Sequence, residues 1–392
     1  MPDTEEFYRI KRLPPYVFES VNRLKAELRG EGRDVIDFGM GNPDMPTPPH
    51  IIEKLIETSQ KPKTNRYSAS KGIAGLRRSI ARYYERRFTV GLNPETEIVA
   101  TLGSKEGFAN LAQAITAPGD VIVAPNPAYP IHAYGFIIAG GVIRAISAPD
   151  PETYLRGVVE AAENTTPAPK VMVLNYPSNP TAQTVDLDFY AEAIAVAERF
   201  DMWVLSDLAY SEIYFGAPPP SILQVKGARD RAVEVNSLSK TYSMAGWRVG
   251  MAVGNARLIG ALARVKSYLD YGAYTPIQVA AAAALDGPQD CVDDIRDTYR
   301  ARRDVLVESF SRAGWDVPAP DASMFAWAPL PPAFHNLGSV EFAKKLMAEA
   351  DVAVAPGLGF GEAGEGCVRI GLVENEQRIR QAARNVKRLL GA

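Results

Sequence analysis

Residues 237–250 read SLSKTYSMAGWRVG and directly follow an apolar stretch that predicts a β-strand. Two hydroxyl side chains precede Lys240, and Arg248 follows it eight residues later. A lysine amine can form an imine with an aldehyde, and Lys240 is therefore a candidate to bind an aldehyde cofactor. Ser237, Ser239 and Arg248 could bind a phosphate on the same cofactor. A surface loop with a solvated lysine is the alternative interpretation of this stretch.

Around this stretch, from about Thr47 to Asp286, short apolar strands alternate with helices. The predicted strands are 97–100, 120–124, 142–146, 170–174, 202–206, 232–235 and 249–253. The predicted helices are 106–116, 129–139 and 188–200, together with an alanine-rich run at 280–284. Such alternation predicts an α/β structure with a mostly parallel sheet flanked by helices.

The pattern changes near Asp286, where a smaller α+β domain is predicted to begin. Its expected elements are a long charged helix at 291–312, a strand at 325–327, a helix at 340–350, strands at 352–355 and 367–371, and a closing helix. The N-terminal segment, with a helix at 17–29 and a strand at 34–38, would complete this domain. We therefore expect residues 46–286 to form the large domain, with residues 1–45 and 287–392 forming the small one.

The composition is that of an ordinary globular protein, and a length of 392 residues suggests two or three domains. The formal net charge is only -3, which argues against a basic nucleic-acid-binding surface. No stretch approaches the roughly 20 apolar residues of a membrane span, and the polar start, Met1 to Arg12, does not resemble a signal peptide. Cys291 and Cys367 predict no disulfide framework, and no cysteine or histidine spacing predicts a metal site. We expect a cytoplasmic protein.

Polar residues follow two further predicted strands. Residues 175–181 read NYPSNPT, and residues 206–210 read SDLAY. In a parallel α/β sheet, ligands bind beyond the carboxyl ends of the strands. Asp207 could keep a pyridine nitrogen protonated, while Asn179 and Tyr210 could hydrogen-bond a phenolic oxygen of the same ring. The alternatives are a helix N-cap for Asp207 and a simple turn at Asn179.

Two glycine-containing segments require opposite interpretations. Residues 102–107, LGSKEG, join a predicted strand to a predicted helix, and a helix N-terminus of this kind favours a bound phosphate. They lack the ending of a nucleotide-binding P-loop. Residues 359–364, GFGEAG, match a dinucleotide-binding pattern, but they lead into a predicted strand instead of a helix. A nicotinamide dehydrogenase is therefore disfavoured.

In this order and spacing, the motifs resemble the class I/II aminotransferases of pyridoxal 5'-phosphate fold type I, from about Leu13 to the C-terminus. The resemblance implies pyridoxal 5'-phosphate as cofactor and Lys240 as the catalytic residue that holds it as a Schiff base. It also assigns Asp207 to the pyridine nitrogen, with Asn179 and Tyr210 at the phenolic oxygen. The further cofactor-binding residues that it implies are Ser104, Lys105, Ser237, Ser239 and Arg248 around the phosphate, and Tyr129, in PNPAYP, against the ring.

The resemblance also implies substrate-binding residues and a partner. Arg369, in VRIG, matches the arginine that binds the substrate α-carboxylate, and Asn179 lies near the same group. Gly41, in GMGNPD, matches the backbone that closes over the substrate. Tyr67, in RYSASKG, matches a tyrosine that reaches the phosphate of a neighbouring subunit. A homodimer with its active site at the subunit interface is therefore expected.

Within the family, the resemblance is strongest to bacterial alanine (glutamate–pyruvate) aminotransferases. The segments that carry it are LPPYVF at 13–18, GSKEG at 103–107, PSNPTAQ at 177–183 and GAYTP at 272–276. The implied reaction converts L-alanine and 2-oxoglutarate to pyruvate and L-glutamate. No arginine lies in residues 268–278, where some aspartate aminotransferases hold the distal carboxylate. Lys105 matches a lysine that serves this role in related bacterial enzymes, although a charge on the phosphate loop is an equal alternative.

Several other activities share this fold. Aspartate and LL-diaminopimelate aminotransferases are the nearest alternatives, and a carbon–sulfur β-lyase dependent on the same cofactor is another. A transcriptional regulator with this fold would need an added DNA-binding segment, for which the residues before Leu13 leave no room. We therefore expect amino-acid and 2-oxo-acid substrates, with no nucleic-acid or membrane partner.

Overall fold

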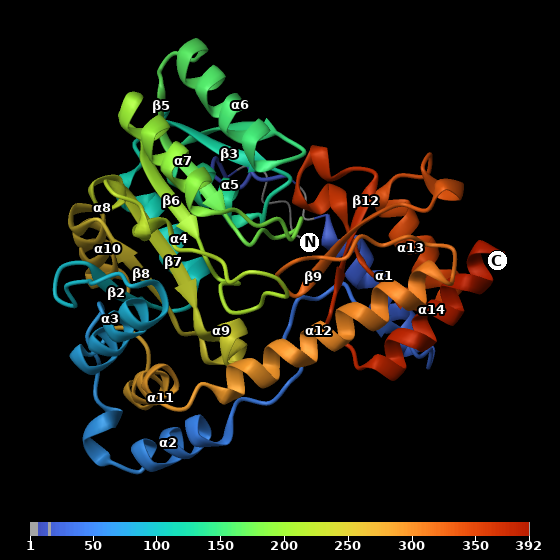
Figure 1. The fold of residues 1–392 in the computed structure, drawn as a ribbon, viewed down its shortest axis with the longest axis horizontal. Coiled ribbons are helices and arrows are strands. Elements are labelled where there is room, and N and C mark those ends of the chain that lie inside the picture. The colour runs from blue at the N-terminus through green and yellow to red at the C-terminus, as the bar shows by residue number, and fades with distance from the viewer. Residues whose placement is uncertain (1–6, 15–16, 392) are drawn as a thin grey trace.

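The computed structural model describes residues 7–14 and 17–391 of the chain. The first six residues of the predicted N-terminal segment lie outside the described residues, as do Pro15 and Tyr16 of the LPPYVF motif. Figure 1 shows a large body built around a sheet and a smaller body that contains the C-terminal helix, with the long helix α12 (Asp290–Ser311) extending from one to the other.

A seven-stranded sheet forms the centre of the large body, in the order β2-β8-β7-β6-β5-β3-β4. The strands are β2 (Ile98–Thr101), β3 (Val121–Asn126), β4 (Val142–Ser147), β5 (Pro169–Asn175), β6 (Trp203–Asp207), β7 (Ala232–Ser237) and β8 (Gly250–Gly254). Neighbouring strands are parallel except around β8, which pairs antiparallel with both β7 and β2. The predicted α/β fold with a mostly parallel sheet is confirmed.

Helices cover both faces of the sheet because successive strand residues point to opposite sides and both sides are apolar. On β5, Val171 and Val173 face one core cluster, whereas Met172 and Leu174 face the other. The first face is covered by α4 (Ser104–Ile115), α5 (Ile131–Ala139) and α10 (Ala256–Leu269). The second is covered by α3 (Ala74–Phe88), α6 (Pro151–Asn164), α7 (Leu187–Arg199) and α11 (Thr275–Asp286), and α2 (Pro49–Ser59) packs on α11. Two one-turn helices, α8 (Ala228–Arg231) and α9 (Leu238–Thr241), flank β7.

The smaller body joins the N-terminal segment to the last hundred residues. β9 (Phe325–Pro329), β12 (Cys367–Gly371) and β11 (Ala355–Pro356) form an antiparallel sheet, and β1 (Ile36–Asp37) pairs in parallel with β10 (Val352–Ala353). Its helices are α1 (Phe18–Gly30), α12, α13 (Ser339–Ala350) and α14 (Glu376–Leu390).

One apolar core spans both ends of the chain in this smaller body. Ile36 and Phe38 of the N-terminal segment are fully buried together with Phe310, Trp315 and Leu346. The ring of Phe38 lies 6.3 Å from that of Phe310. On this packing we propose the domain division expected from the sequence, with residues 1–45 and 287–392 in the small domain and residues 46–286 in the large one.

Some local predictions are wrong. The single strand expected at 352–355 is split, because Ala353 pairs with Asp37 in one sheet whereas Ala355 pairs with Arg369 in another. The helix expected at 129–139 begins at Ile131, since a residue that precedes proline, as Tyr129 does, disfavours helical backbone angles. Among the described residues, every helix is too short or too polar to cross a bilayer.

Candidate active site

A pocket of about 560 Å³ lies between the carboxyl edge of the large sheet and the small domain. β5, β6 and β7 end at Asn175, Asp207 and Ser237, and each of these residues lines the pocket. This is the edge at which ligands bind in parallel α/β sheets. Every site residue predicted from the sequence lines the pocket, except Tyr67; these residues are Gly41, Ser104, Lys105, Tyr129, Asn179, Asp207, Tyr210, Ser237, Ser239, Lys240, Arg248 and Arg369.

One part of the pocket is built to hold an anion. α4 begins at Ser104, and the first-turn N–H groups of a helix have no partner within the helix. Arg248, which lines the pocket beside them, has left-handed backbone angles (φ 58°) and donates to Leu102 O at 3.3 Å and Ala245 O at 2.9 Å. A Cβ at Gly250 would lie 2.6 Å from Ser104 N, so a glycine is required for β8 to approach this turn. The close approach brings the guanidinium and the helix N-terminus together.

Asp207 supplies a buried carboxylate at the end of β6. Its Oδ2 lies 2.9 Å from His132 Nε2, and its Oδ1 accepts from Ala209 N at 3.1 Å. Asn175 Nδ2 donates to the Asp207 carbonyl at 3.0 Å. A carboxylate oxygen is an acceptor, so His132 Nε2 carries the proton in this contact. His132 thereby fixes one oxygen of Asp207 while the residue still lines the pocket.

Sequence reasoning did not identify His132. It is fully buried, and its ring lies 5.9 Å from that of Tyr129. The available signal was its spacing of three residues from Tyr129 at the start of a predicted helix, which places the two side chains on one face. That spacing alone does not identify Asp207 as its partner.

The Lys240 amine is held inside the pocket by a backbone carbonyl. Its Nζ donates to Gly41 O at 2.7 Å. Burial lowers the pKa of Lys240 to about 7, and the positive charges of Arg369 and Arg248 act in the same direction. More of the amine is therefore neutral near neutral pH than in an ordinary lysine, which suits a nucleophile or a general base.

A cation from the small domain reaches across to the large domain. Arg369, on β12, donates from one terminal nitrogen to Asn179 Oδ1 at 2.7 Å and from the other to Gly39 O at 3.2 Å. Asn179 Nδ2 in turn donates to the Tyr210 hydroxyl at 3.3 Å. A guanidinium with both terminal nitrogens facing a pocket can bind a carboxylate by two parallel hydrogen bonds.

Aromatic residues that the sequence did not single out form the walls around this cation. The central carbon of Arg369 lies 4.0 Å from the Phe325 ring centroid and 4.6 Å from that of Phe360. Phe360 belongs to the GFGEAG segment, which leads into β12 and not into a helix. Phe18 of α1 packs edge-on against Phe360 at 5.4 Å. The glycine-rich segment therefore contributes a wall to the pocket.

Tyr67 lies outside the pocket. Its side chain is 87% exposed, and its ring lies 4.8 Å from that of Tyr271. Tyr67 therefore does not line the pocket of its own chain. The expectation from the family resemblance, that it reaches the pocket of a second subunit, stays a prediction.

Comparison with known proteins identifies the family. Residues 33–386 match the family described as aminotransferase class I and II. The chain belongs to the class I and II aminotransferases. A Rhizobium meliloti protein named as an aminotransferase, AatC, is 64% identical over 389 residues, covering 99% of this chain and 96% of that protein. The glutamate-pyruvate aminotransferase AlaC of Escherichia coli is 52% identical over 396 residues, covering 100% of this chain and 96% of that protein. The substrate-bound structure of BacF from Bacillus subtilis is 33% identical with a TM-score of 0.91, covering 99% of this chain and 98% of that chain.

As a member of this family, the aminotransferase depends on pyridoxal 5'-phosphate. The residues of the pocket fit this group, because an amine with a lowered pKa, an anion-binding turn and a buried carboxylate line one cavity. We propose that Lys240 binds the aldehyde and Asp207 binds the pyridine nitrogen. The phosphate ligands would be Ser104, Ser237, Ser239 and Arg248, with Tyr129 against the ring and Asn179 and Tyr210 at the phenolic oxygen.

The lowered pKa of Lys240 predicts how the cofactor-free enzyme reacts with pyridoxal phosphate. Only the neutral amine adds to an aldehyde, so the second-order rate constant should rise with pH and level off above a midpoint of about 7. An ordinary lysine would give a midpoint near 10.4. Stopped-flow absorbance between pH 5.5 and 10 measures this midpoint.

Two controls separate Lys240 from other titrating groups. Free pyridoxal, which lacks the phosphate with its own pKa of about 6, should give the same midpoint. Arg369→Met removes one of the positive charges that lower the pKa and should move the midpoint upward. A rate that still climbs between pH 9 and 10 in the unmodified enzyme would contradict the assignment.

Proposed function

We propose that this aminotransferase exchanges the amino group between L-alanine and 2-oxoglutarate, giving pyruvate and L-glutamate. The full-length similarity supports this choice over its neighbours. The relative named a glutamate-pyruvate aminotransferase is 52% identical, whereas LL-diaminopimelate aminotransferases from Moorella thermoacetica and Desulforudis audaxviator are 40% and 42% identical. LL-diaminopimelate transfer is therefore the second candidate, and aspartate transfer is a third.

The charges that line the pocket carry the proposal. Arg369 is buried and held by fixed hydrogen bonds, which suits the α-carboxylate that all the substrates share. Lys105 is an exposed cation on the first turn of α4. Its amine lies 5.7 Å from the Tyr129 ring centroid, and no hydrogen bond or ion pair joins it to any residue within 7–14 and 17–391. It is therefore available for the distal carboxylate of glutamate or 2-oxoglutarate.

The acidic residues of the pocket disfavour a second ammonium group on the substrate. Among the described lining residues, only Asp37 and Asp207 are acidic. Asp37 forms an ion pair with Lys25 at 2.8 Å and accepts from Gly39 N at 3.0 Å, and Asp207 contacts His132. LL-diaminopimelate carries a distal ammonium as well as a distal carboxylate. Neither Asp37 nor Asp207 is without a partner, so the pocket better fits a side chain that is either small or singly anionic.

The positions of these residues support the following proposal for the reaction. Pyridoxal phosphate supplies an aldehyde that accepts the amino group and a ring that withdraws electrons from the substrate Cα. Arg369 would orient the substrate by its α-carboxylate. Once the substrate amino group has displaced Lys240 from the aldehyde carbon, the freed neutral Nζ would take the proton from Cα. Asp207, held by His132, would keep the ring nitrogen protonated by accepting its hydrogen bond. Lys240 Nζ would then give back the proton that it took, and water would release the product 2-oxo acid. A second 2-oxo acid would take up the amino group by the reverse of these steps.

A carbon–sulfur β-lyase would use the same cofactor and the same lysine without an acceptor. The relatives and the family named above are aminotransferases, which favours amino-group transfer over elimination. A lyase would release pyruvate and ammonia from cystathionine in the absence of any 2-oxo acid.

We also propose a homodimer whose subunits complete each other's sites. Large apolar residues are exposed around Tyr67. They are, with their exposed fractions, Tyr67 (87%), Tyr268 (77%), Leu269 (58%), Tyr271 (61%) and Tyr274 (43%). Four of these residues lie within residues 268–274, and the Tyr67 ring packs against Tyr271, so we propose this exposed apolar surface as the association site. A second copy that covers it would place Tyr67 next to the phosphate of its neighbour, as in the family pattern.

A half-reaction screen tests the proposed substrates. The enzyme loaded with pyridoxal phosphate is mixed in turn with alanine, glutamate, aspartate, LL-diaminopimelate, methionine and an aromatic amino acid. Loss of the visible cofactor band should be fast with alanine and glutamate and at least about 100-fold slower with the others, a difference of about 2.7 kcal/mol. Rapid conversion with LL-diaminopimelate or aspartate would instead show that the enzyme is an aminotransferase for that substrate.

Lys240→Ala tests the role of the lysine and should abolish turnover. Substantial transamination by this variant would refute the role proposed for Lys240.

Lys105→Ala tests the distal-carboxylate site. Loss of a hydrogen bond to a charged group costs about 1.5–3 kcal/mol, so kcat/KM for glutamate should fall about 10- to 100-fold. The value for alanine should stay within about threefold of the unmodified enzyme, because alanine has no distal carboxylate. Lys344→Ala, on α13 outside the pocket, is the matched control. Equal losses for alanine and glutamate would instead place Lys105 at the phosphate.

Leu269→Glu tests the subunit interface. A charge introduced into the covered patch should weaken the dimer and increase cofactor loss on dilution, because each pocket would lack its neighbour's Tyr67. Leu337→Glu, at an exposed position that precedes α13, provides the same substitution away from the patch and should leave the dimer intact. Analytical ultracentrifugation across a concentration series measures both. A monomeric unmodified enzyme that retains its cofactor would contradict the proposal.

A further inference from the structure

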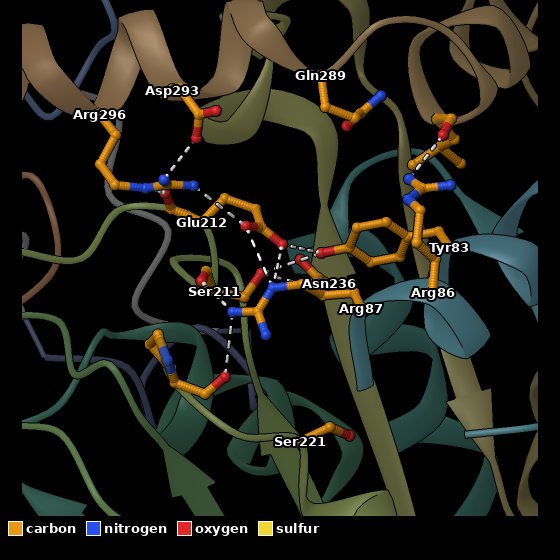
Figure 2. A network of polar contacts seen from close by, with 12 residues as sticks. Tyr83, Arg86, Arg87, Ser211, Glu212, Ser221, Asn236, Gln289, Asp293 and Arg296 are labelled. Atoms are coloured by element: carbon orange, nitrogen blue, oxygen red, sulfur yellow. Dashed lines mark hydrogen bonds and ion pairs between the residues drawn. The ribbon is translucent and has the colours of Figure 1, made fainter. Parts of the chain in front are cut away.

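Two residues beyond Tyr210, the chain enters a cluster of polar side chains centred on the carboxylate of Glu212 (Figure 2). The Tyr83 hydroxyl donates to Glu212 Oε1 at 2.6 Å, and Arg87 Nε donates to the same oxygen at 3.1 Å. A terminal nitrogen of Arg296 lies 3.6 Å from Glu212 Oε2. We call Tyr83, Arg87, Glu212 and Arg296 the Glu212 cluster.

The Glu212 cluster joins elements from both domains. Tyr83 and Arg87 project from α3 of the large domain, and Arg296 projects from α12, as Figure 2 shows. Glu212 is only 6% exposed, so its charge requires such partners. Burial raises the pKa of Tyr83 well above its ordinary value, and the charge of Glu212 acts in the same direction. The Tyr83 hydroxyl therefore stays protonated and remains a donor.

The two arginines of the cluster also hold the main chain beside Glu212. A terminal nitrogen of Arg87 donates to Ser211 O at 3.3 Å, and Arg296 Nε donates to Glu212 O at 3.0 Å. The Glu212 carboxylate aligns both guanidinium groups, and these groups fix the carbonyls of two consecutive residues. Removing the negative charge would loosen both contacts at once.

Tyr210 is connected to these carbonyls through two tight turns. Ser211 N donates to Leu208 O at 3.1 Å, and Ile213 N donates to Tyr210 O at 3.1 Å. At its other end, the Tyr210 side chain reaches the pocket, where its hydroxyl accepts from Asn179 at 3.3 Å. Because residues 208–213 are hydrogen-bonded in succession, the fixed carbonyls of Ser211 and Glu212 set the direction in which Tyr210 projects.

The same loop is also fixed by the small domain. Phe215 N donates to Asp321 O at 2.7 Å, and Ser323 N donates to Ile213 O at 2.8 Å. Two residues further on, the Phe325 ring packs edge-on against Tyr210 at 5.6 Å. Tyr210 is thus held at its backbone by the Glu212 cluster and at its ring by a residue that also lies against Arg369.

We propose that Glu212 is a positioning residue for the transamination reaction, which holds the Tyr210 hydroxyl at the phenolic oxygen of bound pyridoxal phosphate through Arg87 and Arg296. This inference rests on the proposed role of Tyr210. Glu212 does not line the pocket, so it touches neither substrate nor cofactor. A hydroxyl that donates to the phenolic oxygen lowers the affinity of that part of the cofactor for a proton. A displaced Tyr210 should therefore change the pH titration of the bound cofactor.

Glu212→Gln is the primary test, because it keeps the shape of the side chain and removes its charge. The holoenzyme is titrated with pH while the visible absorbance of the cofactor is followed, and no substrate is needed. We expect the midpoint to rise by about 0.5–1 pH unit, the size expected when one hydrogen bond is weakened. Tyr83→Phe removes the contact with Glu212 at 2.6 Å and a longer one with the Ser211 hydroxyl at 3.4 Å. It keeps the carboxylate and both arginines, and should give a smaller shift in the same direction. It serves in the same experiment if Glu212→Gln does not fold.

Asp293→Asn is the matched control. Asp293 accepts from Arg296 at 2.7 Å, but its side chain is 68% exposed, so solvent screens its charge, and an asparagine keeps an oxygen that can accept from the same arginine. The substitution removes a carboxylate partner of the same arginine and should leave the cofactor titration unchanged. Equal midpoint shifts for Asp293→Asn and Glu212→Gln would overturn the proposal, because they would reflect a general change in charge.

A double-mutant cycle with Tyr210→Phe separates positioning from a purely structural role. Tyr210→Phe should raise the midpoint by itself, and adding Glu212→Gln to it should cause no further shift. Two outcomes would overturn the proposal: Glu212→Gln lowers the Tm but leaves the midpoint unchanged, or it shifts the midpoint equally with and without Tyr210. A Tyr210→Phe enzyme with an unchanged midpoint would overturn the assignment of Tyr210 itself, and the half-reaction screen would still decide the substrates.

Discussion

The geometry of this site depends on the hydrogen bonds of the Arg369 guanidinium, because they join three separate segments of the chain. It donates to Asn179 in the large domain and to Gly39 in the N-terminal segment, while it is itself carried by β12. A buried cation is unfavourable without partners, so these contacts and the flanking rings of Phe325 and Phe360 stabilise it. The position of this guanidinium is therefore set by contacts from both domains, and the proposed binding of a substrate carboxylate would depend on their packing.

The same positive charge also lowers the pKa of the Lys240 amine. Arg369 and Arg248 add to the effect of burial in lowering the pKa of Lys240 to about 7, so the groups suited to binding anions also favour the neutral form of the base. The carbonyl oxygen of Gly41 completes this arrangement, because it accepts a hydrogen bond from the Lys240 amine at 2.7 Å. A Cβ at Gly41 would lie 2.5 Å from the ring of Phe325, which also packs against Arg369. This close contact is the reason that position 41 requires a glycine.

The candidate residues at the strand ends were predictable from sequence because their chemistry and position are both local properties. Lys240 follows an apolar strand together with its hydroxyl neighbours, and Asp207 ends another. His132 was not predictable, because its partner Asp207 lies 75 residues away, and the Arg87 contact with Glu212 spans 125 residues. The split of the strand expected at 352–355 has the same origin, since two separate sheets compete for adjacent residues. Periodicity identifies an element, whereas its partners are set by packing.

Substrate choice in this fold depends on which charges are already paired. An enzyme that uses both alanine and glutamate must bind a distal carboxylate in one half of the cycle and tolerate its absence in the other. A buried arginine built to bind that carboxylate would be left unpaired whenever alanine is bound, at a considerable energetic cost. An exposed lysine can return to water instead, since its long apolar stem lets the charged end move. Lys105 has this property, because its amine is exposed and unbonded within the described chain, whereas Asp37 is fixed by Lys25. The arrangement thus suits the two proposed amino donors, one with a methyl side chain and one whose longer side chain ends in a carboxylate.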